Sequence, residues 1–228
     1  MNYYKPLLAG NIYHITARAI GSEKLFLHDD NYNFFLQRYD KYITPVAETF
    51  AWALLPNHFH LLVQIKPHEA LQELYSNKNP HKKITEDWQP VFVMQCFSNM
   101  LNSYAKAFNK QNNRKGGLFM DYMRRVEITS DQQYTATVFY IHKNPVHHGY
   151  CSKINDWPWT SFQTILSQTP TKLQRNEVLQ WFGGLNKFIE YHNQPIHLKN
   201  AVVLEYENLP NLQGLEPDNA TRQNLIMF

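Results

Sequence analysis

The chain of 228 residues, 43% of them hydrophobic, is long enough for one domain of ordinary size with a buried core. Its two cysteines, Cys96 and Cys151, form no CxxC pair, which argues against a disulfide scaffold and a thiolate zinc site. The N-terminus lacks a signal-peptide pattern and no apolar run approaches the roughly 20 residues of a membrane span, so we expect a soluble, cytoplasmic protein.

The net charge of +3 is unevenly distributed along the chain. Between residues 91 and 150 the basic side chains outnumber the acidic ones, and from residue 196 onward the balance reverses. A basic middle and an acidic tail indicate a polyanion site in the first part. The basic residues of the middle segment are Lys106, Lys110, Arg114, Lys115, Arg124, Arg125 and Lys143.

The first half of the chain predicts three strands and a helix. Residues 11–19 alternate between apolar and polar side chains, which indicates a half-buried strand with His14, Thr16 and Arg18 on its polar face. Apolar residues at helical spacing follow, with Asp29 or Asp30 as a possible cap, and Pro45 ends this helix. Strands at 47–55 and 58–66 flank a turn at residues 56–57, which predicts a hairpin.

The second half begins with a polar stretch, residues 66–90, that we interpret as a loop with at most a short helix. An amphipathic helix then includes residues 97–108, a turn covers 111–117, and 118–128 is predicted to be a strand. Ser130 with Gln133 forms a capping box for a helix that Pro145 stops after Asn144. One more helix is expected through residues 181–191, and the final 25 or so residues look loosely ordered.

These elements spell βαββαβ, an α+β, ferredoxin-like arrangement. We therefore expect an antiparallel sheet with helices on one face, and the helix that follows the last strand on the other. We divide the chain into residues 1–150, the main domain, and 151–228, a partly helical C-terminal extension.

The segment from Leu55 to Val63 places two histidines at the start of an apolar strand, directly after a tight turn. Because alternate side chains of a strand share a face, His58 and His60 lie together, away from Phe59. Two imidazoles on an open sheet face can hold one divalent metal ion. A His-x-His pair also occurs on ordinary surfaces, so the pair alone leaves both readings open.

The segment from Thr137 to Val146 is the second informative one. Tyr140 and Asn144 are four residues apart and share one helical face, so a phenol and an amide oxygen can approach one ion. Lys143 lies near them in the sequence and could contact a phosphate. Taken alone, such a tyrosine is more often a half-buried core residue.

Together, these segments resemble the HUH single-tyrosine transposases of the insertion-sequence-200-like class, and most closely their REP-associated tyrosine transposase branch. The two main motifs are residues 56–63 and 140–146, and the similarity runs in order from about residue 10 to 165. The supporting matches are Tyr13-His14-Ile15 with Arg18, Gly117-Leu118-Phe119 leading to Arg124-Arg125-Val126, and residues 156–162.

The resemblance implies a role for each motif residue. His58 and His60 would be the metal ligands, Phe59 the hydrophobic residue between them, and Tyr140 the nucleophile. Asn144 stands where the family often has a third ligand, commonly glutamine, and it is shorter.

The implied reaction is metal-dependent nicking and rejoining of hairpin-bearing single-stranded DNA through a 5′-phosphotyrosine. An unaided tyrosine, with a pKa near 10, is a poor nucleophile at neutral pH, so Mg²⁺ or Mn²⁺ at the scissile phosphate is expected. The candidate DNA contacts are Arg18, Lys106, Lys110, Arg114, Lys115, Arg124, Arg125 and Lys143. We assign no catalytic role to His142, His147 or His148.

Two other functions are compatible with parts of the sequence. A domesticated protein would bind hairpin DNA and regulate it without cutting, and a metal-dependent hydrolase would use activated water and form no protein–DNA adduct. The chain is expected to act as a monomer or homodimer, and the long C-terminal extension favours the monomer.

Overall fold

The computed structural model describes residues 5–120 and 123–195, and within them it confirms an α+β fold built on an antiparallel sheet. The strands are β1 (Ile12–Arg18), β2 (Ala47–Leu55), β3 (His58–Ile65) and β4 (Arg124–Ile128), and their order in the sheet is β2-β3-β1-β4. The first three agree with the predicted strands to within about one residue, because their apolar alternation and the turn at residues 56–57 are strong local signals.

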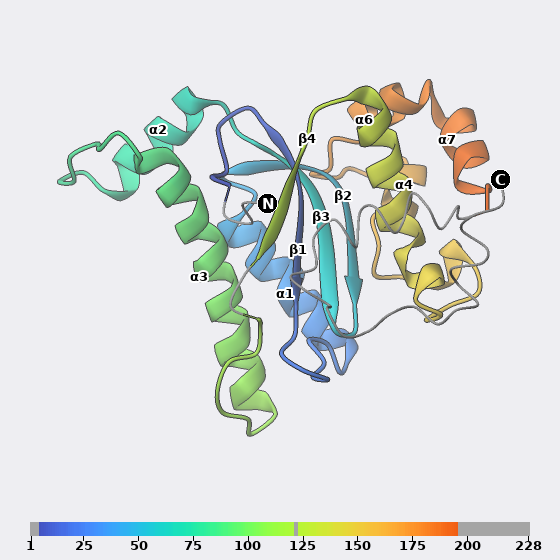
Figure 1. The fold of residues 1–228 in the computed structure, drawn as a ribbon, viewed down its shortest axis with the longest axis horizontal. Coiled ribbons are helices and arrows are strands. Elements are labelled where there is room, and N and C mark those ends of the chain that lie inside the picture. Colours follow the sequence, from blue (N-terminus) through green and yellow to red (C-terminus); the bar gives the residue numbers. More distant parts are fainter. Residues whose placement is uncertain (1–4, 121–122, 196–228) are drawn as a thin grey trace, which may run out of the picture. The chain divides into compact units, whose positions relative to one another are not determined.

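Helices α1 (Asp29–Tyr42) and α3 (Trp88–Gln111) cover one face of this sheet, on the opposite side from α4 (Asp131–His147) (Figure 1). The main core lies beneath the first two helices. There, Phe59 of β3 packs against Phe35 of α1, with ring centroids 5.0 Å apart, and Phe97 of α3 is fully buried in the same cluster. Burial of these large rings on the helix-covered face stabilises the fold.

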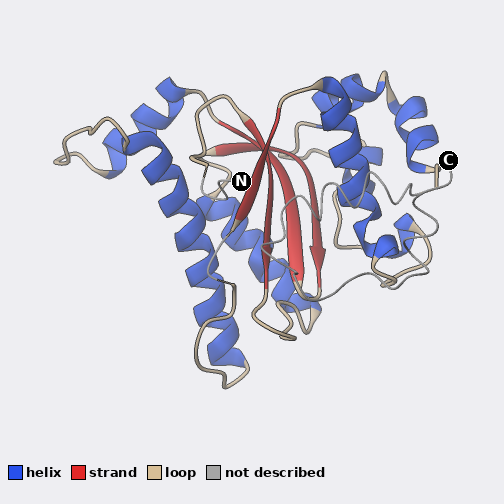
Figure 2. Ribbon diagram, viewed as in Figure 1, coloured by secondary structure: helices blue, strands red, loops and turns tan. Residues whose placement is uncertain are grey.

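The segment expected to be mainly loop is more helical than predicted (Figure 2). It contains α2 (His68–Lys78), and α3 begins at Trp88 rather than near residue 97. Leu71 and Trp88 explain the difference, because both are buried and pack with the core. Tertiary packing stabilises α2 although its sequence is mainly polar.

The start of α1 also differs from the prediction. The residue at the N-cap is His28, and the side chain of Asn31 accepts hydrogen bonds from the backbone N–H groups of Leu27 and His28. Asp29 and Asp30 occupy the first turn instead, where carboxylates still favour the positive end of the helix dipole.

The fourth strand is shorter than the predicted 118–128. Regular pairing with β1 begins at Arg124, and Phe119 makes only an isolated bridge with Ala19. Residues 121–122 lie outside the described part of the chain.

Helix α4 begins as predicted but does not stop before Pro145. The Ser130 side chain accepts a hydrogen bond from the Gln133 N–H, which confirms the N-cap. Pro145 lies inside the helix, which runs to His147, since the backbone N–H groups of His148 and Tyr150 bond to the carbonyls of Asn144 and Pro145. A proline removes one helical hydrogen bond, and here the bonds that follow it hold the last turn.

The C-terminal segment contains η1 (Ile154–Asp156), α5 (Phe162–Leu166), α6 (Arg175–Phe182) and α7 (Leu185–His192). The single helix expected through residues 181–191 is therefore two helices. Gly183 separates them with a φ of +76°, a left-handed conformation that ends α6 and that glycine adopts without strain.

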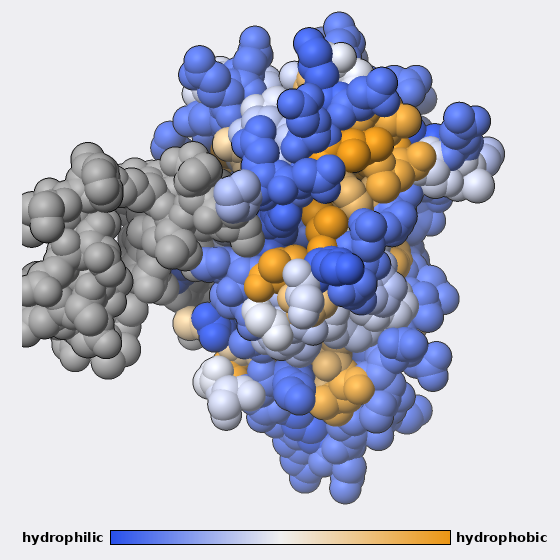
Figure 3. Space-filling model, turned by 90° about the vertical axis from the view of Figure 1, so that its right-hand side faces the viewer, coloured by the Kyte–Doolittle hydropathy of each residue, from blue (hydrophilic) through white to orange (hydrophobic). Residues whose placement is uncertain are grey.

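This segment pairs with the outer edge of β2. The Leu54 N–H donates to the Trp159 carbonyl at 2.8 Å, the Ser161 N–H donates to the Trp52 carbonyl at 2.9 Å, and Thr160 forms a bridge with Ala53. Such pairing covers an otherwise open sheet edge. Figure 3 shows the side carrying α6 and α7 as mainly hydrophilic with small apolar patches, and Leu185 and Ile189 of α7 are among the exposed apolar side chains.

None of the helices within residues 5–120 and 123–195 is both long and apolar enough to cross a membrane. The final 25 or so residues, expected to be loosely ordered, lie outside the described part of the chain.

Replacement of Phe59 by alanine tests the position of the core. Because Phe59 is fully buried, we expect Phe59→Ala to lower the free energy of unfolding by about 3–5 kcal/mol, as measured by urea denaturation. The exposed Val91 of α3 is the control, and Val91→Ala should change stability by no more than about 0.5 kcal/mol. Equal losses in the two variants would contradict this core.

Candidate active site

The two histidines of β3 lie on the sheet face that α4 covers. Strand alternation separates them from Phe59, which points into the core on the other face. His58 and His60 are 9% and 5% exposed, and their rings meet edge to face with centroids 4.9 Å apart. The two imidazoles thus lie together on one face of β3, as the sequence predicts.

Tyr140 lies on the part of α4 that faces these histidines. Its ring is edge-on to His60, with centroids 5.3 Å apart, and edge-on to His14 of β1 at 5.8 Å. The phenol side chain is 5% exposed. The structure therefore brings together the predicted nucleophile and one of the predicted ligands within a single chain.

Asn144, one helical turn after Tyr140, completes the group. Its Oδ1 lies 3.2 Å from His58 Nε2. The other ring nitrogen of His58, Nδ1, is 2.7 Å from Asn57 Oδ1, and a carbonyl oxygen can only accept a hydrogen bond. Nδ1 of a neutral His58 therefore donates, which leaves a lone pair on Nε2 facing the lone pairs of Asn144 Oδ1. Imidazole nitrogen and amide oxygen are both atoms that can bind a divalent cation.

His60 has one ring nitrogen engaged and one unsatisfied. Its Nδ1 lies 3.0 Å from Nε2 of His14, whereas its Nε2 is buried and has no hydrogen-bond partner. A buried polar atom without a partner costs free energy unless a ligand or ion satisfies it. This atom supports a metal site at the position where the family motif predicts one.

Burial keeps these imidazoles neutral. It lowers the pKa of His14 to about 4, and it lowers the pKa of His60 well below its ordinary value, with further lowering by the neighbouring His58, His14 and His148 and a smaller opposing effect of the Asn144 side chain. Only a neutral imidazole has a lone pair with which to bind a metal ion.

The residues present, two imidazole nitrogens and one amide oxygen, fit a divalent ion that keeps part of its own hydration. Within the described residues, no three His, Cys, Asp or Glu side chains converge on a metal-sized site, so the protein offers two imidazoles and one amide oxygen at most. Mg²⁺ commonly keeps several waters and binds a substrate phosphate through the remaining positions.

Two of the predicted DNA-binding residues lie on the same sheet face. Arg18 is exposed and is directly opposite His58 in the β1–β3 register. Arg124 is half-buried and is opposite Thr16, which in turn pairs with His60. Directly paired residues share a face, so both guanidinium groups belong to the side with the histidines.

The other predicted DNA contacts lie elsewhere. Lys106 and Lys110 are exposed on α3, which covers the opposite sheet face, and Lys115 is exposed in the loop that follows. Arg114 forms an ion pair with Glu23 at 3.2 Å. These residues do not gather around Tyr140.

Arg125 and Lys143 also point away from the histidine pair. Arg125 pairs with Ile15, on the face toward α3, and contacts the Met94 sulfur at 3.1 Å. Lys143 lies over the Phe139 ring at 5.7 Å, and its charge helps to lower the pKa of His192 in α7. The phosphate contact predicted for Lys143 stays a prediction.

His14 and His148 contribute more than the sequence analysis assigned to them. His14 stacks on His60 with centroids 5.2 Å apart, and the His148 ring is 5.0 Å from that of His58. For His14 the signal was its place on the polar face of β1. His148 comes directly after α4, and no periodic pattern in the sequence predicts that it lies near His58.

His142 serves the packing of α4 on its outward side. It is fully buried, with Nδ1 3.0 Å from His192 Nε2 and Nε2 2.8 Å from Ser161 Oγ. These contacts lie away from Tyr140 and Asn144, in keeping with the absence of a predicted catalytic role.

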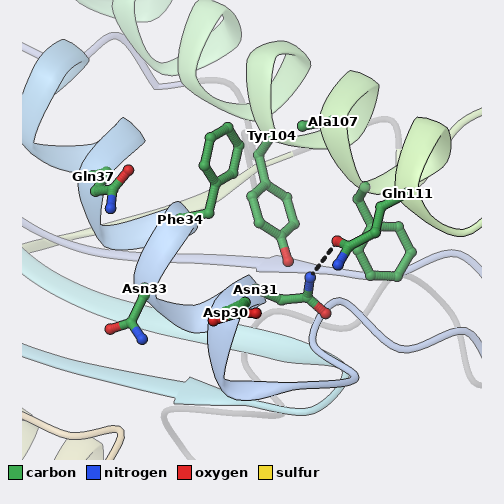
Figure 4. A pocket seen from close by; sticks show the side chains of 9 residues that line it. Asp30, Asn31, Asn33, Phe34, Gln37, Tyr104, Ala107 and Gln111 are labelled. Carbon is green, nitrogen blue, oxygen red and sulfur yellow. Dashed lines mark hydrogen bonds between the residues drawn. The ribbon is translucent and has the colours of Figure 1, made fainter.

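A separate cavity of about 320 Å³ opens between α1 and α3, on the side of the sheet away from the histidine pair (Figure 4). Amide side chains such as Asn33 and Gln37 line it, and Asn31 donates to Gln111 Oε1 at 2.8 Å. The cavity contains none of the predicted catalytic residues.

Comparison with known proteins gives matches both in sequence and in structure. No family model matches the chain. A protein of Haemophilus influenzae that provisionally carries the name REP-associated tyrosine transposase is 28% identical over 164 residues, which are 71% of this chain and 85% of that protein.

The second match is a structure of a REP-associated tyrosine transposase bound to a REP hairpin. It has a TM-score of 0.52 and 16% identity, and it covers 75% of this chain and 88% of the other. At that identity the match shows a shared fold. Sequence and fold agree, and the resemblance of this chain to the REP-associated tyrosine transposases is confirmed.

Proposed function

We propose that the protein is a metal-dependent transposase that nicks and rejoins hairpin-bearing single-stranded DNA through a covalent bond to Tyr140. The observation that carries this proposal is the convergence of the Tyr140 ring, the unpartnered Nε2 of His60 and the His58–Asn144 pair beneath α4. The relative from Haemophilus influenzae and the hairpin-bound structure support the choice of DNA as substrate.

Each residue has a defined part in this reaction. The phenol oxygen of Tyr140 attacks a backbone phosphorus, the bond to the 3′-oxygen breaks, and that oxygen leaves with a proton as a free hydroxyl. The 5′-phosphate stays on Tyr140, so the reverse attack rejoins DNA without an external energy source. His58 and His60, with Asn144, would hold a Mg²⁺ or Mn²⁺ ion. When bound, the ion supplies charge neutralisation at the scissile phosphate.

The β1–β4 half of the same sheet face is the candidate path for the DNA strand. Arg18 is exposed, and Thr16 and Arg124 are half-buried, so this part of the face is reachable from solvent within the described residues. Basic side chains there neutralise backbone phosphates and let a flexible strand reach the phenol.

The proposal also covers the type of sheet, the division into domains, the oligomeric state and the location. We take the sheet as ferredoxin-like, with residues 1–150 as the catalytic domain and 151–228 as a C-terminal extension. The complete set of site residues comes from one chain, which favours a monomer over a homodimer with shared sites. Action on genomic DNA places the protein in the cytoplasm.

Substitution of Tyr140 tests the covalent step. Tyr140→Phe removes only the nucleophilic oxygen, so we expect no protein–DNA adduct on a denaturing gel with labelled hairpin DNA and Mn²⁺, while DNA binding is retained. An adduct in this variant would remove Tyr140 from the role. Cleavage without any adduct in the wild type would instead favour a hydrolase, and binding without cleavage would favour a DNA-binding regulator.

Removal of an imidazole tests the metal site. We expect His58→Ala and His60→Ala each to lower Mn²⁺-dependent cleavage by orders of magnitude and to weaken Mn²⁺ binding measured by calorimetry. EDTA should abolish cleavage by the wild type. Full activity of both variants would show that these histidines are not ligands.

The position of Arg18 predicts a direct phosphate contact. Arg18→Ala should weaken single-stranded DNA binding and lower the slope of log affinity against log salt by about 0.7, the value of one contact to a single strand. Lys106→Ala is the matched control from the opposite sheet face and should leave the slope unchanged. A reversed result would place the DNA over α3.

A further inference from the structure

His14 is a buried histidine next to the candidate ligands that the two main motifs do not include. It is 2% exposed, and its Nε2 lies 3.0 Å from His60 Nδ1, with the two rings stacked at an angle of 16°. In the strand register His14 is opposite Leu62 and Thr16 is opposite His60, so the contact between the histidines is diagonal.

This contact can hold one proton in either of two arrangements. If His60 Nδ1 donates to His14 Nε2, a neutral His60 keeps a lone pair on its own Nε2. If His14 donates instead, the proton of His60 is on Nε2, where it has no hydrogen-bond partner and blocks metal binding. Only the first arrangement makes His60 a ligand.

We propose that His14 is a positioning residue, which accepts the hydrogen bond from His60 Nδ1 and so holds His60 in the tautomer whose Nε2 can bind a divalent cation. Histidine ligands in proteins commonly donate their second ring N–H to a fixed partner, and that partner sets both tautomer and ring orientation. The inference rests on the proposed metal-dependent function.

A second contact extends the effect of His14 to the nucleophile. The Tyr140 ring meets His14 edge to face at 5.8 Å and His60 at 5.3 Å, with interplanar angles of 81° and 87°. The phenol ring thus packs against both imidazoles of the stacked pair. His14 therefore positions His60 by a hydrogen bond, and its ring also packs against the ring of Tyr140.

Three substitutions at this position separate the hydrogen bond from the packing. His14→Phe keeps a flat ring but has no acceptor, and His14→Gln offers an amide oxygen at a similar reach. Val91→Ala, at an exposed position of α3 on the other side of the sheet, is the control. Should His14→Phe fail to fold, as judged by urea denaturation, His14→Leu takes its place.

The first measurement is the tautomer of His60 in metal-free protein, read from the imidazole ¹⁵N shifts and assigned by comparison with His60→Gln. We expect a proton on Nδ1 in the wild type, a shift toward the Nε2–H form in His14→Phe, and recovery in His14→Gln. A role in stability alone would not move this signal.

The second measurement is Mn²⁺ affinity by electron paramagnetic resonance. His14→Phe should weaken binding by about 10- to 100-fold, the usual effect of losing a partner of a metal ligand, and His14→Gln should recover most of it. Val91→Ala should match the wild type.

The outcomes distinguish this inference from the function on which it rests. Unchanged tautomer and affinity in His14→Phe would overturn the role of His14, even if His60→Ala loses the metal. Failure of the wild type to bind Mn²⁺ would overturn the metal-dependent function, and a proton found on His60 Nε2 in the wild type would overturn the inference itself.

Discussion

The alternation of side chains along β3 is the constraint on which the site depends. Phe59 must point into the core formed with α1 and α3, and this direction forces His58 and His60 to the opposite face. A slip of one residue in the register would bury both imidazoles in an apolar core and place a large aromatic ring beneath α4 instead of them. The same packing that stabilises the sheet therefore fixes the direction of the two candidate ligands.

The covering of this face by α4 gives the site its chemistry. On an open sheet the two imidazoles would be solvated, whereas under α4 they are almost completely buried, and burial disfavours their charged forms. Neutral nitrogens with unshared lone pairs are thus held beside a phenol. The buried Nε2 of His60 has no hydrogen-bond partner, and this is the physical reason to expect a cation there.

The sequence was informative where a local pattern determines the structure, and less so elsewhere. The pairing of His58 with His60 follows from strand periodicity, and the pairing of Tyr140 with Asn144 follows from helical spacing. The contact of His14 with His60 joins two strands 46 residues apart, so no local pattern reveals it. The basic residues between 106 and 115 were predicted from local charge, which has no direction, and the structure places them away from Tyr140.

The outward side of α4 shows why the C-terminal segment matters to a site that contains none of its residues. Tyr140 and Asn144 face the sheet, and His142, halfway between them, points the other way into contacts with Ser161 and His192. Ser161 also accepts a hydrogen bond from the Trp52 N–H of β2. One hydroxyl therefore connects the helix of the nucleophile to the sheet of the ligands. A chain cut at residue 150 would leave His142 without both partners, and the position of Tyr140 would lose its support on that side.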